Sequence, residues 1–341
     1  MKVLVTGGAG FIGSALVRRL IGDGVAVDTV DALTYAGNRA NLATVEGSPL
    51  HTFHEVDVCD LEALRRVVWD SAPDALVHLA AETHVDRSID GAGAFLRTNV
   101  MGTFNLLEVV KEFAGDEFRF LHVSTDEVFG SLGESGRFSE ASRYDPNSPY
   151  AASKAASDHL VRAWHRTYGI DAMITNCSNT YGPYQFPEKL LPLVISKAVK
   201  GEPIPIYGDG LQVRDWLHVD DHVAGLLAVL ERGRAGETYN IGGYGERTNR
   251  DIVALVLDAV AQVHGRNRAT LQDLITTVDD RPGHDRRYAI DPTKIETELG
   301  WAPRIALEDG IASLVAWYRD NDAWCRQVAR TYDGERLGRG S

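Results

Sequence analysis

The sequence contains few cysteines and no long apolar segment. The three cysteines, Cys59, Cys177 and Cys325, form no Cys-x-x-Cys pair, and an odd number suits a disulfide framework poorly. We therefore expect buried thiols in a reducing, cytoplasmic compartment. No apolar run approaches the ~20 residues that span a bilayer. Glycines interrupt the N-terminal stretch from Gly7 onward, so neither a transmembrane helix nor a signal peptide is predicted.

Positive charge is also scarce. Lysine and arginine number 35 against 48 aspartates and glutamates, which gives a formal net charge of -13. Such an acidic balance argues against nucleic acid as the main partner. The remaining composition, 44% hydrophobic and 24% charged in 341 residues, is typical of a soluble globular protein with one large domain and an appendage, or with two domains.

Apolar runs alternate with segments of helical periodicity over the first half of the chain. We predict strands at 2–6, 25–30, 50–56, 75–80, 119–123 and 170–175, and helices at 11–21, 60–69, 95–113 and 150–168. Asp60 is the expected N-cap of the second helix. Strands that alternate with helices indicate an α/β fold, a doubly wound, mostly parallel sheet of the Rossmann type.

The pattern changes after residue 176, where proline and glycine become frequent. This change predicts a smaller, mixed C-terminal lobe that binds substrate. We expect residues 1–176 to form the first domain and 177–329 to form mainly the second, with parts of 213–243 returning to the first. The polar segment 330–341 is predicted to be loosely held.

Glycines follow the first predicted strand and open the first helix. Gly7 suits a tight turn, Gly10 lets backbone approach a pyrophosphate, and Gly13 lets the helix pack on the strand. Asp31 ends the next strand, where a carboxylate can accept hydrogen bonds from an adenosine ribose and would repel a 2′-phosphate. The spacing therefore predicts binding of NAD rather than NADP. A purely structural glycine turn is the alternative.

The segment "YAASK" places Tyr150 and Lys154 one turn apart on one face of a predicted helix. A nearby ammonium group favours the phenolate, so we expect the pKa of Tyr150 to be lowered toward neutrality. Such a tyrosine can take a proton from a hydroxyl group while a hydride leaves the same carbon. A surface pair without function is the alternative.

Two adjacent acids, Asp126 and Glu127, follow the fifth predicted strand in "STDEVFG". Two carboxyl groups in one partly dry site push their pKa values apart, so that one can serve as acid and the other as base. The order of the residues does not say which acid has which role. The alternative is a solvated turn.

These segments, with "YGPYQFPEKLLP" at 181–192, resemble the nucleoside-diphosphate-hexose 4,6-dehydratases of the extended short-chain dehydrogenase/reductase superfamily. The likeness runs from Lys2 to about Asp320 and is greatest to the members that act on dTDP-glucose. It implies oxidation at C4 by NAD, loss of water from C5–C6 and return of the hydride to C6, which gives dTDP-4-keto-6-deoxyglucose. Alternatives are a dehydratase for CDP-glucose or GDP-mannose, an NAD-dependent nucleotide-sugar epimerase, which does not need both acids, and an inactive NAD-binding regulator.

The resemblance also implies roles for individual residues. Thr125 would hydrogen-bond the reacting oxygen, Asp126 would be the acid and Glu127 the base, and Tyr150 would deprotonate the C4 hydroxyl with Lys154 as its partner. The implied cofactor contacts are Gly7, Gly10, Phe11, Ile12, Gly13, Asp31, Leu33, Thr34, Asp57, Val58, Leu79, Ala80, Ala81, Thr98, Tyr150, Lys154 and Thr180. The implied substrate contacts are Thr83, Thr125, Asn179, Lys189, Leu190, Pro205, Tyr207, Arg214, Asn249, Arg281 and His284.

Some of these implied roles have alternatives. Arg214 and Arg281 would bind phosphate or nucleotide, or instead form surface or interdomain salt bridges. Thr180 stands where the family usually has asparagine, and we expect its cofactor contact to survive directly or through water. In "HVDDH", residues 218–222, a valine stands where a metalloprotease needs glutamate. We therefore predict that this segment binds no metal and that it instead begins a helix, which its acids cap.

The two long helices predicted at 95–113 and 150–168 carry apolar side chains beyond the single stripe that each can bury on its own sheet. Members of the family usually pair through these helices as a four-helix bundle. The resemblance therefore implies a homodimer.

Overall fold

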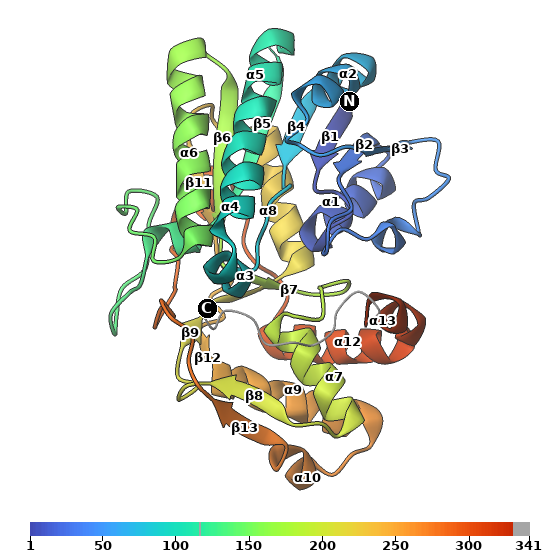
Figure 1. The fold of residues 1–341 in the computed structure, drawn as a ribbon, viewed down its shortest axis with the longest axis vertical. Coiled ribbons are helices and arrows are strands. Elements are labelled where there is room, and N and C mark those ends of the chain that lie inside the picture. Colours follow the sequence, from blue (N-terminus) through green and yellow to red (C-terminus); the bar gives the residue numbers. More distant parts are fainter. Residues whose placement is uncertain (116, 330–341) are drawn as a thin grey trace.

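A computed structural model describes residues 1–115 and 117–329 of the chain. The predicted loose tail at 330–341 lies outside the described residues. A parallel seven-stranded sheet forms the upper half of the molecule, and a smaller lobe lies below the carboxyl ends of its strands (Figure 1).

The strands are β1 (Lys2–Thr6), β2 (Ala26–Asp31), β3 (His51–Glu55), β4 (Ala75–His78), β5 (Arg119–Thr125), β6 (Asp171–Cys177), β7 (Asn179–Tyr181), β8 (Ile204–Tyr207), β9 (Val213–Arg214), β10 (Trp216–His218), β11 (Thr238–Ile241), β12 (Arg247–Thr248) and β13 (Ile275–Val278). The α-helices are α1 (Phe11–Gly22), α2 (Leu61–Ser71), α3 (Val85–Asp90), α4 (Ala92–Phe95), α5 (Thr103–Phe113), α6 (Pro149–Tyr168), α7 (Leu190–Lys200), α8 (Val219–Arg232), α9 (Asn249–His264), α10 (Arg268–Gln272), α11 (Thr293–Leu299), α12 (Leu307–Asp320) and α13 (Asp322–Ala329). Two 3-10 turns, η1 (Arg39–Leu42) and η3 (Asp126–Phe129), and a π-helical segment, η2 (Leu96–Gly102), complete the described elements.

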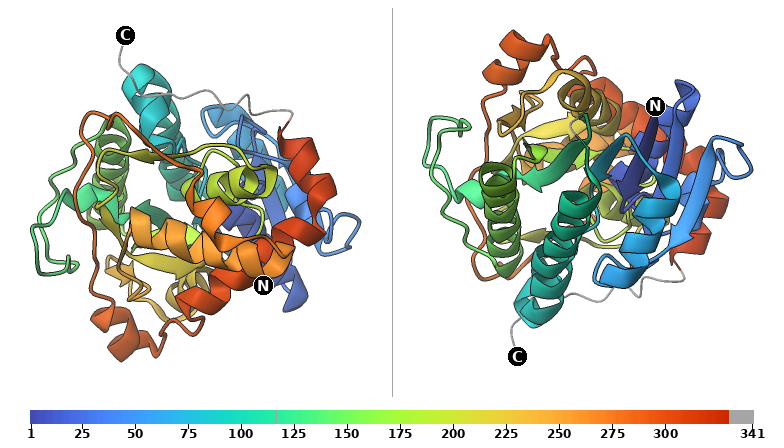
Figure 2. Two further views of the ribbon diagram at one scale, coloured as in Figure 1. Left: turned by 90° about the horizontal axis from the view of Figure 1, so that it is seen from below. Right: turned by 90° about the horizontal axis from the view of Figure 1, so that it is seen from above.

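The main sheet has the strand order β11-β6-β5-β4-β1-β2-β3. Helices α2, α5 and α6 cover one face and α1 and α8 cover the other, as the view from above shows (Figure 2). Val3, Leu4 and Val5 of β1 are fully buried, as expected for a parallel strand covered on both faces. The predicted α/β class and the six predicted strands are confirmed. The chain reverses its direction of winding between β1 and β4, and such a switch point opens a crevice for ligands.

Polar side chains begin two of the predicted helices. The Asp60 carboxylate accepts a hydrogen bond from the Ala63 backbone N–H at 3.0 Å, which confirms the predicted cap of α2. Ser148 caps α6 by accepting from the Ala151 N–H at 3.0 Å, and Pro149 occupies the first turn. A proline there loses no helical hydrogen bond, so α6 starts at a defined residue just before Tyr150.

The helix predicted at 95–113 is not one regular helix. It consists of α4, the π-helical segment η2 and α5 in succession. The Asn99 carbonyl in η2 accepts hydrogen bonds from the Thr103 hydroxyl at 2.6 Å and from the Ser157 hydroxyl of α6 at 2.7 Å. A π-helical turn leaves carbonyl groups without their usual helical donors, and these two hydroxyl groups replace them. The wide turn thus joins the helix to α6.

The lower lobe has its own apolar core beneath the main sheet. Helices α7, α9 and α12 bury Leu191, Val256 and Leu314 in this core, where α9 packs against both other helices and α7 packs against β8 of the short parallel pair β8 and β13. After β10 the chain returns upward, where α8 packs on α1 and β11 extends the main sheet beside β6. The domain boundary at residue 176 stays a prediction.

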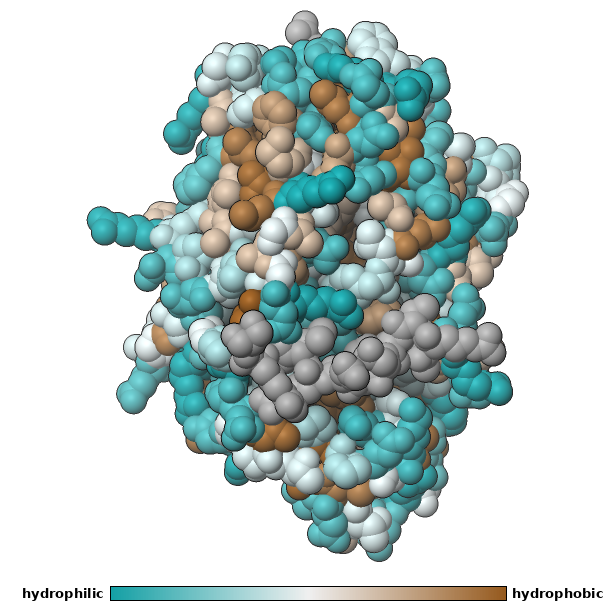
Figure 3. All heavy atoms as spheres, viewed as in Figure 1, coloured by the Kyte–Doolittle hydropathy of each residue, from teal (hydrophilic) through white to brown (hydrophobic). Residues whose placement is uncertain are grey.

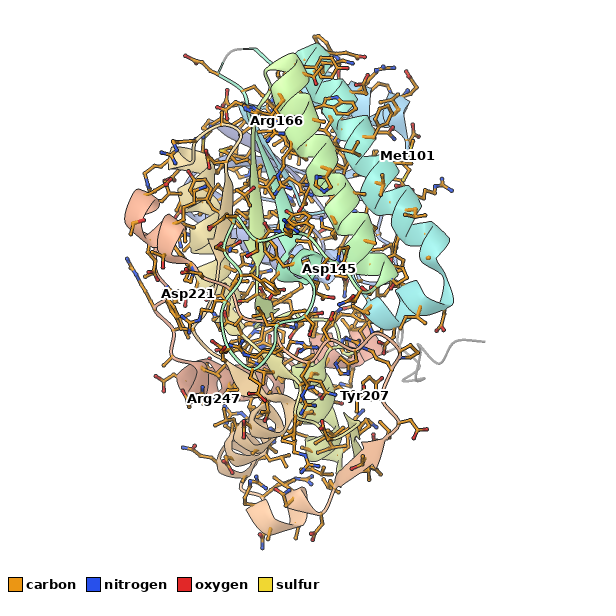
Figure 4. All side chains as sticks on the ribbon, turned by 90° about the vertical axis from the view of Figure 1, so that its left-hand side faces the viewer. Met101, Asp145, Arg166, Tyr207, Asp221 and Arg247 are labelled. Atoms are coloured by element: carbon orange, nitrogen blue, oxygen red, sulfur yellow. The ribbon has the colours of Figure 1, made fainter. Side chains whose placement is uncertain are left out.

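The segment "HVDDH" begins α8, but the expectation that its acids cap the helix is wrong. The cap is His218, whose Nδ1 accepts from the Asp220 N–H at 3.2 Å. The Asp221 carboxylate instead accepts the backbone N–H groups of Arg304 and Ile305 at 3.0 and 2.9 Å, so it ties α8 to the segment before α12. Figure 4 shows Asp221 at the level between the sheet and the lower lobe. Within residues 1–115 and 117–329, no group of three His, Cys, Asp or Glu side chains forms a candidate metal site.

The cysteines are free thiols, but only Cys177 is buried, whereas Cys59 and Cys325 are partly exposed. The expectation of uniformly buried thiols is therefore wrong for two of the three, because these two lie near the surface rather than on a strand of the sheet. Among the helices of the described residues, none combines the length and apolar composition needed to cross a membrane.

Candidate active site

A cavity of about 340 Å³ opens at the carboxyl ends of the sheet strands. Its walls come from the segments that follow β1, β2, β4, β5 and β6, together with residues of α6. This is the crevice expected at the switch point between β1 and β4.

The glycine loop forms one end of the cavity. Gly7 adopts a φ of +70°, and a Cβ atom on it would lie 2.6 Å from the Ala80 nitrogen. A Cβ atom on Gly13 would lie 2.1 Å from the Gly7 carbonyl oxygen. Gly10 caps α1 without any side chain, so no side chain of the cap blocks the N–H groups of the first turn. These groups are therefore available to an anion.

Asp31 links the glycine loop to the end of β2. Its Oδ2 accepts from the Ala9 N–H at 2.9 Å, and its Oδ1 accepts from the Leu33 N–H at 2.8 Å. Each carboxylate oxygen has a further lone pair, so acceptor capacity remains for a ribose hydroxyl. Leu33, an expected cofactor contact, does not line the cavity; its backbone orients Asp31, and its side chain packs on the apolar core.

The other expected cofactor residues all lie on the wall of this one cavity. They are Gly7, Gly10, Phe11, Ile12, Gly13, Asp31, Thr34, Asp57, Val58, Leu79, Ala80, Ala81, Thr98, Tyr150, Lys154 and Thr180. The cavity also includes residues that the sequence reasoning missed, among them Tyr35, Glu82, Tyr184, Phe186, Glu188 and His222. Three of these, Tyr184, Phe186 and Glu188, stand within "YGPYQFPEKLLP", so this segment contains a signal for them.

The acid pair is not a solvated turn. Strand β5 ends at Thr125, whose hydroxyl accepts from the Glu127 N–H at 3.3 Å and so caps the 3-10 turn η3. Asp126 is only 2% exposed, while Glu127 is partly buried. Both side chains line the cavity together with Thr125 and Tyr150.

The two acids have different electrostatic surroundings. Burial raises the pKa of Asp126 well above its usual value, and the charges of Glu127 and Asp215 raise it further. Burial also raises the pKa of Glu127, but the cations Arg281, Arg214 and Lys189 oppose this shift. Asp126 therefore favours the protonated form of a general acid, and Glu127 has the better stabilised carboxylate of a general base.

Tyr150 and Lys154 do share one face of α6, but the expected lowering of the tyrosine pKa is wrong for the protein alone. Burial and the nearby Glu127 charge raise the pKa of Tyr150 well above its usual value, although its contact with Thr125 lowers it. The Lys154 ammonium donates instead to the Val123 carbonyl at 2.9 Å. Helical spacing predicts that Lys154 shares a face with Tyr150, but it does not reveal that the Val123 carbonyl competes for the ammonium group.

A buried polar network lies behind Lys154. Burial lowers the pKa of Lys154 to about 8, and the Asp158 carboxylate opposes this shift. Lys154 Nζ lies 3.5 Å from His122 Nε2, which in turn lies 3.2 Å from Asp158 Oδ1. Asp158 also accepts hydrogen bonds from the hydroxyl groups of Ser124 at 2.9 Å and Tyr144 at 2.8 Å. The Asp158 carboxylate thus balances the charge of Lys154.

The expected substrate residues divide into two groups. Thr83, Thr125, Asn179 and Lys189 line the cavity, and Lys189 Nζ donates to the Thr83 carbonyl at 3.3 Å. The structure does not bring the others to its wall, namely Leu190, Pro205, Tyr207, Arg214, Asn249, Arg281 and His284. Their positions lie mainly in or beside the lower lobe, and Figure 4 shows Tyr207 there.

Two arginines of the second group already have partners. Arg281 forms an ion pair with Asp86 of α3 at 2.6 Å, which is the interdomain salt bridge considered as the alternative to a ligand contact. Tyr207 donates to the same Asp86 carboxylate at 3.2 Å. Arg214 lies over the Tyr288 ring and donates to backbone carbonyl groups rather than to a carboxylate. Both arginines oppose the rise of the Glu127 pKa, so these two side chains lie near the acid pair.

Comparison with known proteins gives a consistent result. A family model described as GDP-mannose 4,6 dehydratase matches residues 4–314. The chain is 54% identical to a dTDP-glucose 4,6-dehydratase of Xanthomonas campestris pv. campestris, over 98% of both chains. The chain belongs to the dTDP-glucose 4,6-dehydratase family.

Solved structures agree with this membership. The dTDP-glucose 4,6-dehydratase DesIV of Streptomyces venezuelae, solved with NAD and TYD bound, is 49% identical and superposes with a TM-score of 0.90 over 96% of this chain and 100% of that chain. A Thermus thermophilus UDP-glucose 4-epimerase in complex with NAD is more distant, at 30% identity and a TM-score of 0.84 over 94% of this chain and 100% of that chain. Dehydratases and epimerases thus share the fold, and the site must distinguish them.

Proposed function

We propose that this member of the dTDP-glucose 4,6-dehydratase family is a hydro-lyase that converts dTDP-glucose to dTDP-4-keto-6-deoxyglucose, with NAD as a cofactor that is regenerated in each cycle. The observation that carries the proposal is the buried pair Asp126 and Glu127 in the same cavity as Tyr150 and Lys154. Oxidation at one carbon requires only the tyrosine, the lysine and the cofactor, whereas elimination of water also requires an acid and a base.

The residues present fit NAD. Gly7 and Gly13 have no room for a Cβ atom because backbone packs against them, and Gly10 carries no side chain that would keep backbone away from a pyrophosphate. The uncapped N-terminus of α1 suits an anion, and the Asp31 carboxylate suits a ribose hydroxyl and disfavours a 2′-phosphate. When bound, the cofactor would accept a hydride from C4 of the sugar and return it to C6.

The side chains would perform the proton transfers. Tyr150, with the contact to Thr125, would take the proton of the C4 hydroxyl. The resulting C4 ketone makes the C5 proton acidic, and the Glu127 carboxylate would remove it. Asp126, whose pKa burial raises well above its usual value, would protonate the departing C6 hydroxyl. Glu127 would then return its proton to C5.

The lower lobe would bind the nucleotide end of the substrate. Lys189, Arg214 and Arg281 provide positive charge near Glu127, which suits a diphosphate. For Arg281 to bind phosphate, it must exchange its ion pair with Asp86 for the ligand, so substrate binding would loosen one link between the lobes. Pro205 and Tyr207 of β8 are the proposed contacts for the base, and the preference for thymidine rests on the relatives.

We also propose that the protein is a cytoplasmic homodimer that pairs through η2, α5 and α6. Leu96 and Met101 of η2 and Tyr168 of α6 are each 50% or more exposed, although Leu107 of α5 is fully buried in its own subunit. Figure 3 shows apolar atoms at the surface of the upper half of the molecule, and Figure 4 labels Met101 on the outer side of its helix. Sedimentation at micromolar concentration should give dimers, and particles of monomer size would refute the pairing.

The test of the reaction is incubation of the purified protein with dTDP-glucose, followed by mass analysis of the sugar. Loss of one water without net accumulation of NADH is the expected result. An unchanged mass with inversion at C4 would support an epimerase instead. Asp126→Asn is the matched variant, since it preserves shape and removes the acidic proton. It should still reduce NAD but eliminate water roughly 100-fold more slowly or worse, and abolished hydride transfer would contradict the division of roles.

A further inference from the structure

The proposed reaction, on which this inference rests, requires the reduced cofactor to stay bound between two steps. Oxidation at C4 moves a hydride from the sugar to NAD, and the same hydride later goes to C6. If NADH left the site in this interval, the sugar would remain a 4-keto compound without the hydride for C6. The cycle therefore needs a part of the chain that slows dissociation of the dinucleotide.

The C-terminal helix α13 contacts the end of the cavity that holds the glycine loop. The Trp324 indole N–H donates to Asn41 Oδ1 at 2.8 Å, across 283 positions of the sequence. The Asn41 side-chain amide donates in turn to the Ala9 carbonyl of the glycine loop at 2.9 Å. Both views of Figure 2 show the C-terminal helices in red beside the N-terminal segments in blue. Trp324 thus supports from outside the loop in which a pyrophosphate would bind.

The same tryptophan packs on a second part of the cavity wall. Tyr184 lines the cavity with a φ of +68°, a backbone conformation that bulky residues rarely adopt. The centroid of its ring lies 5.6 Å from that of Trp324 and 4.7 Å from that of Trp317 in α12. The adjacent Gln185 also lines the cavity, and its carbonyl accepts from the Tyr318 hydroxyl at 3.0 Å. Since an unfavourable φ persists only where surrounding contacts hold it, α12 and α13 fix this wall.

Arg18 of α1 connects the two contacts of Trp324. Its Cζ lies 4.3 Å from the centroid of the Tyr184 ring, and its Nη1 donates to the Asn41 carbonyl at 2.5 Å. Trp324, Asn41, Arg18 and Tyr184 therefore form a closed ring of contacts, in which each residue touches two others. A displacement of one member loses contacts to both of its neighbours, so the glycine loop and Tyr184 are coupled.

We propose that Trp324 and Trp317 are positioning residues that retain the dinucleotide. They do not line the cavity themselves, so they act through the residues that do. Trp324 supports the glycine loop through Asn41, and both tryptophans support the cavity wall through Tyr184. This support slows the dissociation of NAD and NADH without forming or breaking a covalent bond. The hydride taken from C4 is then still in the site when C6 is ready to receive it.

Two variants separate the two contacts. Trp324→Phe keeps a ring beside Tyr184 but removes the hydrogen bond to Asn41. Trp317→Leu leaves that hydrogen bond in place but removes one ring beside Tyr184. Trp164→Phe is the matched control, because it also loses an indole hydrogen bond, of 3.0 Å to a glutamate of α5. Trp164 does not line the cavity and packs against a different apolar cluster.

The first measurement is the rate at which bound NAD leaves the purified holoenzyme after dilution, without sugar. This rate should rise roughly fivefold in Trp324→Phe, which loses one hydrogen bond. It should rise roughly threefold in Trp317→Leu, which loses one aromatic pair. It should keep its wild-type value in Trp164→Phe.

The second measurement is the NADH found in a filtrate during turnover of dTDP-glucose. Trp324→Phe and Trp317→Leu should release NADH together with a 4-keto sugar to which no hydride has been returned, whereas the wild-type protein should release neither. Added NAD should restore turnover in both variants, because it refills the empty site. Damage to the fold elsewhere would not be restored in this way.

Two outcomes overturn the proposal. One is NAD dissociation at the wild-type rate from Trp324→Phe and Trp317→Leu, and if one of these variants fails to fold the other decides. The second is equally fast loss of NAD from Trp164→Phe, because the effect would then be a general loosening of the protein. Failure of the proposed reaction looks different, since the wild-type protein would retain NAD but form no dehydrated product.

Discussion

Replacement of Asp158 by asparagine would test how the buried network below α6 sets the charge of Lys154. The wild-type carboxylate is fully buried, accepts hydrogen bonds from Ser124 and Tyr144, and is the group that opposes the lowering of the Lys154 pKa. Asparagine has nearly the same shape but no charge. The change should therefore act on Lys154 through electrostatics more than through packing.

The size of the effect follows from the distances. Lys154 Nζ and Asp158 Oδ1 are at most about 6.7 Å apart, the sum of the 3.5 Å from Lys154 to His122 and the 3.2 Å from His122 to Asp158. At an effective dielectric constant of about 20, a unit charge pair at that distance or closer interacts by roughly 2–3 kcal/mol or more, which corresponds to about two pKa units. Asp158→Asn should thus lower the pKa of Lys154 from about 8 to near or below neutrality.

The pH dependence of kcat/KM measures this shift. A charged Lys154 is required at the site, so its deprotonation should appear as the alkaline limb of the profile. In Asp158→Asn this limb should move to lower pH by about two units. Tyr144→Phe removes a hydrogen bond to Asp158 but preserves its charge, so its limb should stay in place. An alkaline limb that does not move in Asp158→Asn would refute the electrostatic role.

The same lysine affects folding with a defined sign. Its pKa is about 8 in the folded protein, below the value of 10.5 for an ordinary lysine. The unfolded chain therefore binds more protons between these two values. Burial of the ammonium group destabilises the fold fully below pH 8, and this cost disappears as the pH rises toward 10.5.

Three further changes test the cofactor end of the site. Trp324→Leu removes the 2.8 Å hydrogen bond from the α13 indole to Asn41, whose side-chain amide donates a hydrogen bond to a carbonyl of the glycine loop. The rate at which NAD dissociates should rise roughly tenfold, which fluorescence after dilution would measure. Gly13→Ala places a Cβ atom 2.1 Å from a loop carbonyl and should abolish NAD retention, whereas Gly22→Ala, which meets nothing within 4 Å, should retain NAD normally. Thr180→Asn should alter NAD retention and rate, because it breaks a 3.0 Å hydrogen bond to a buried histidine on the cavity wall; unchanged values would mean that this position does not tune the cofactor.

Local sequence patterns predicted most of the strands of the main sheet. The strands were recognisable because parallel strands covered on both faces are continuous apolar runs, and β1 is one such run. Parallel strands also bring their carboxyl ends to one edge, which places residues after β1, β2 and β5 that are distant in sequence, such as Gly7, Asp31 and Asp126, near one another. They do line one cavity.

Features that depend on partners distant in the sequence were not predictable in this way. The ion pair between Arg281 and Asp86 joins residues 195 positions apart, and nothing in either segment indicates the other. The π-helical segment η2 depends on the hydroxyl of Ser157 in another helix. Likewise, helical spacing placed Lys154 beside Tyr150, but the Val123 carbonyl that accepts its hydrogen bond lies on β5.

The different roles proposed for Asp126 and Glu127 also depend on partners that are distant in the sequence. Adjacent residues in a 3-10 turn point about 120° apart, so Asp126 and Glu127 meet different neighbours although they are consecutive. Asp126 lies near Asp215 and Arg214, while Glu127 lies near Arg281, Arg214 and Lys189. These three cations are also the proposed contacts of the substrate diphosphate. A bound diphosphate would offset their charge and raise the basicity of Glu127, so the nucleotide end of the substrate would strengthen the base that acts on the sugar.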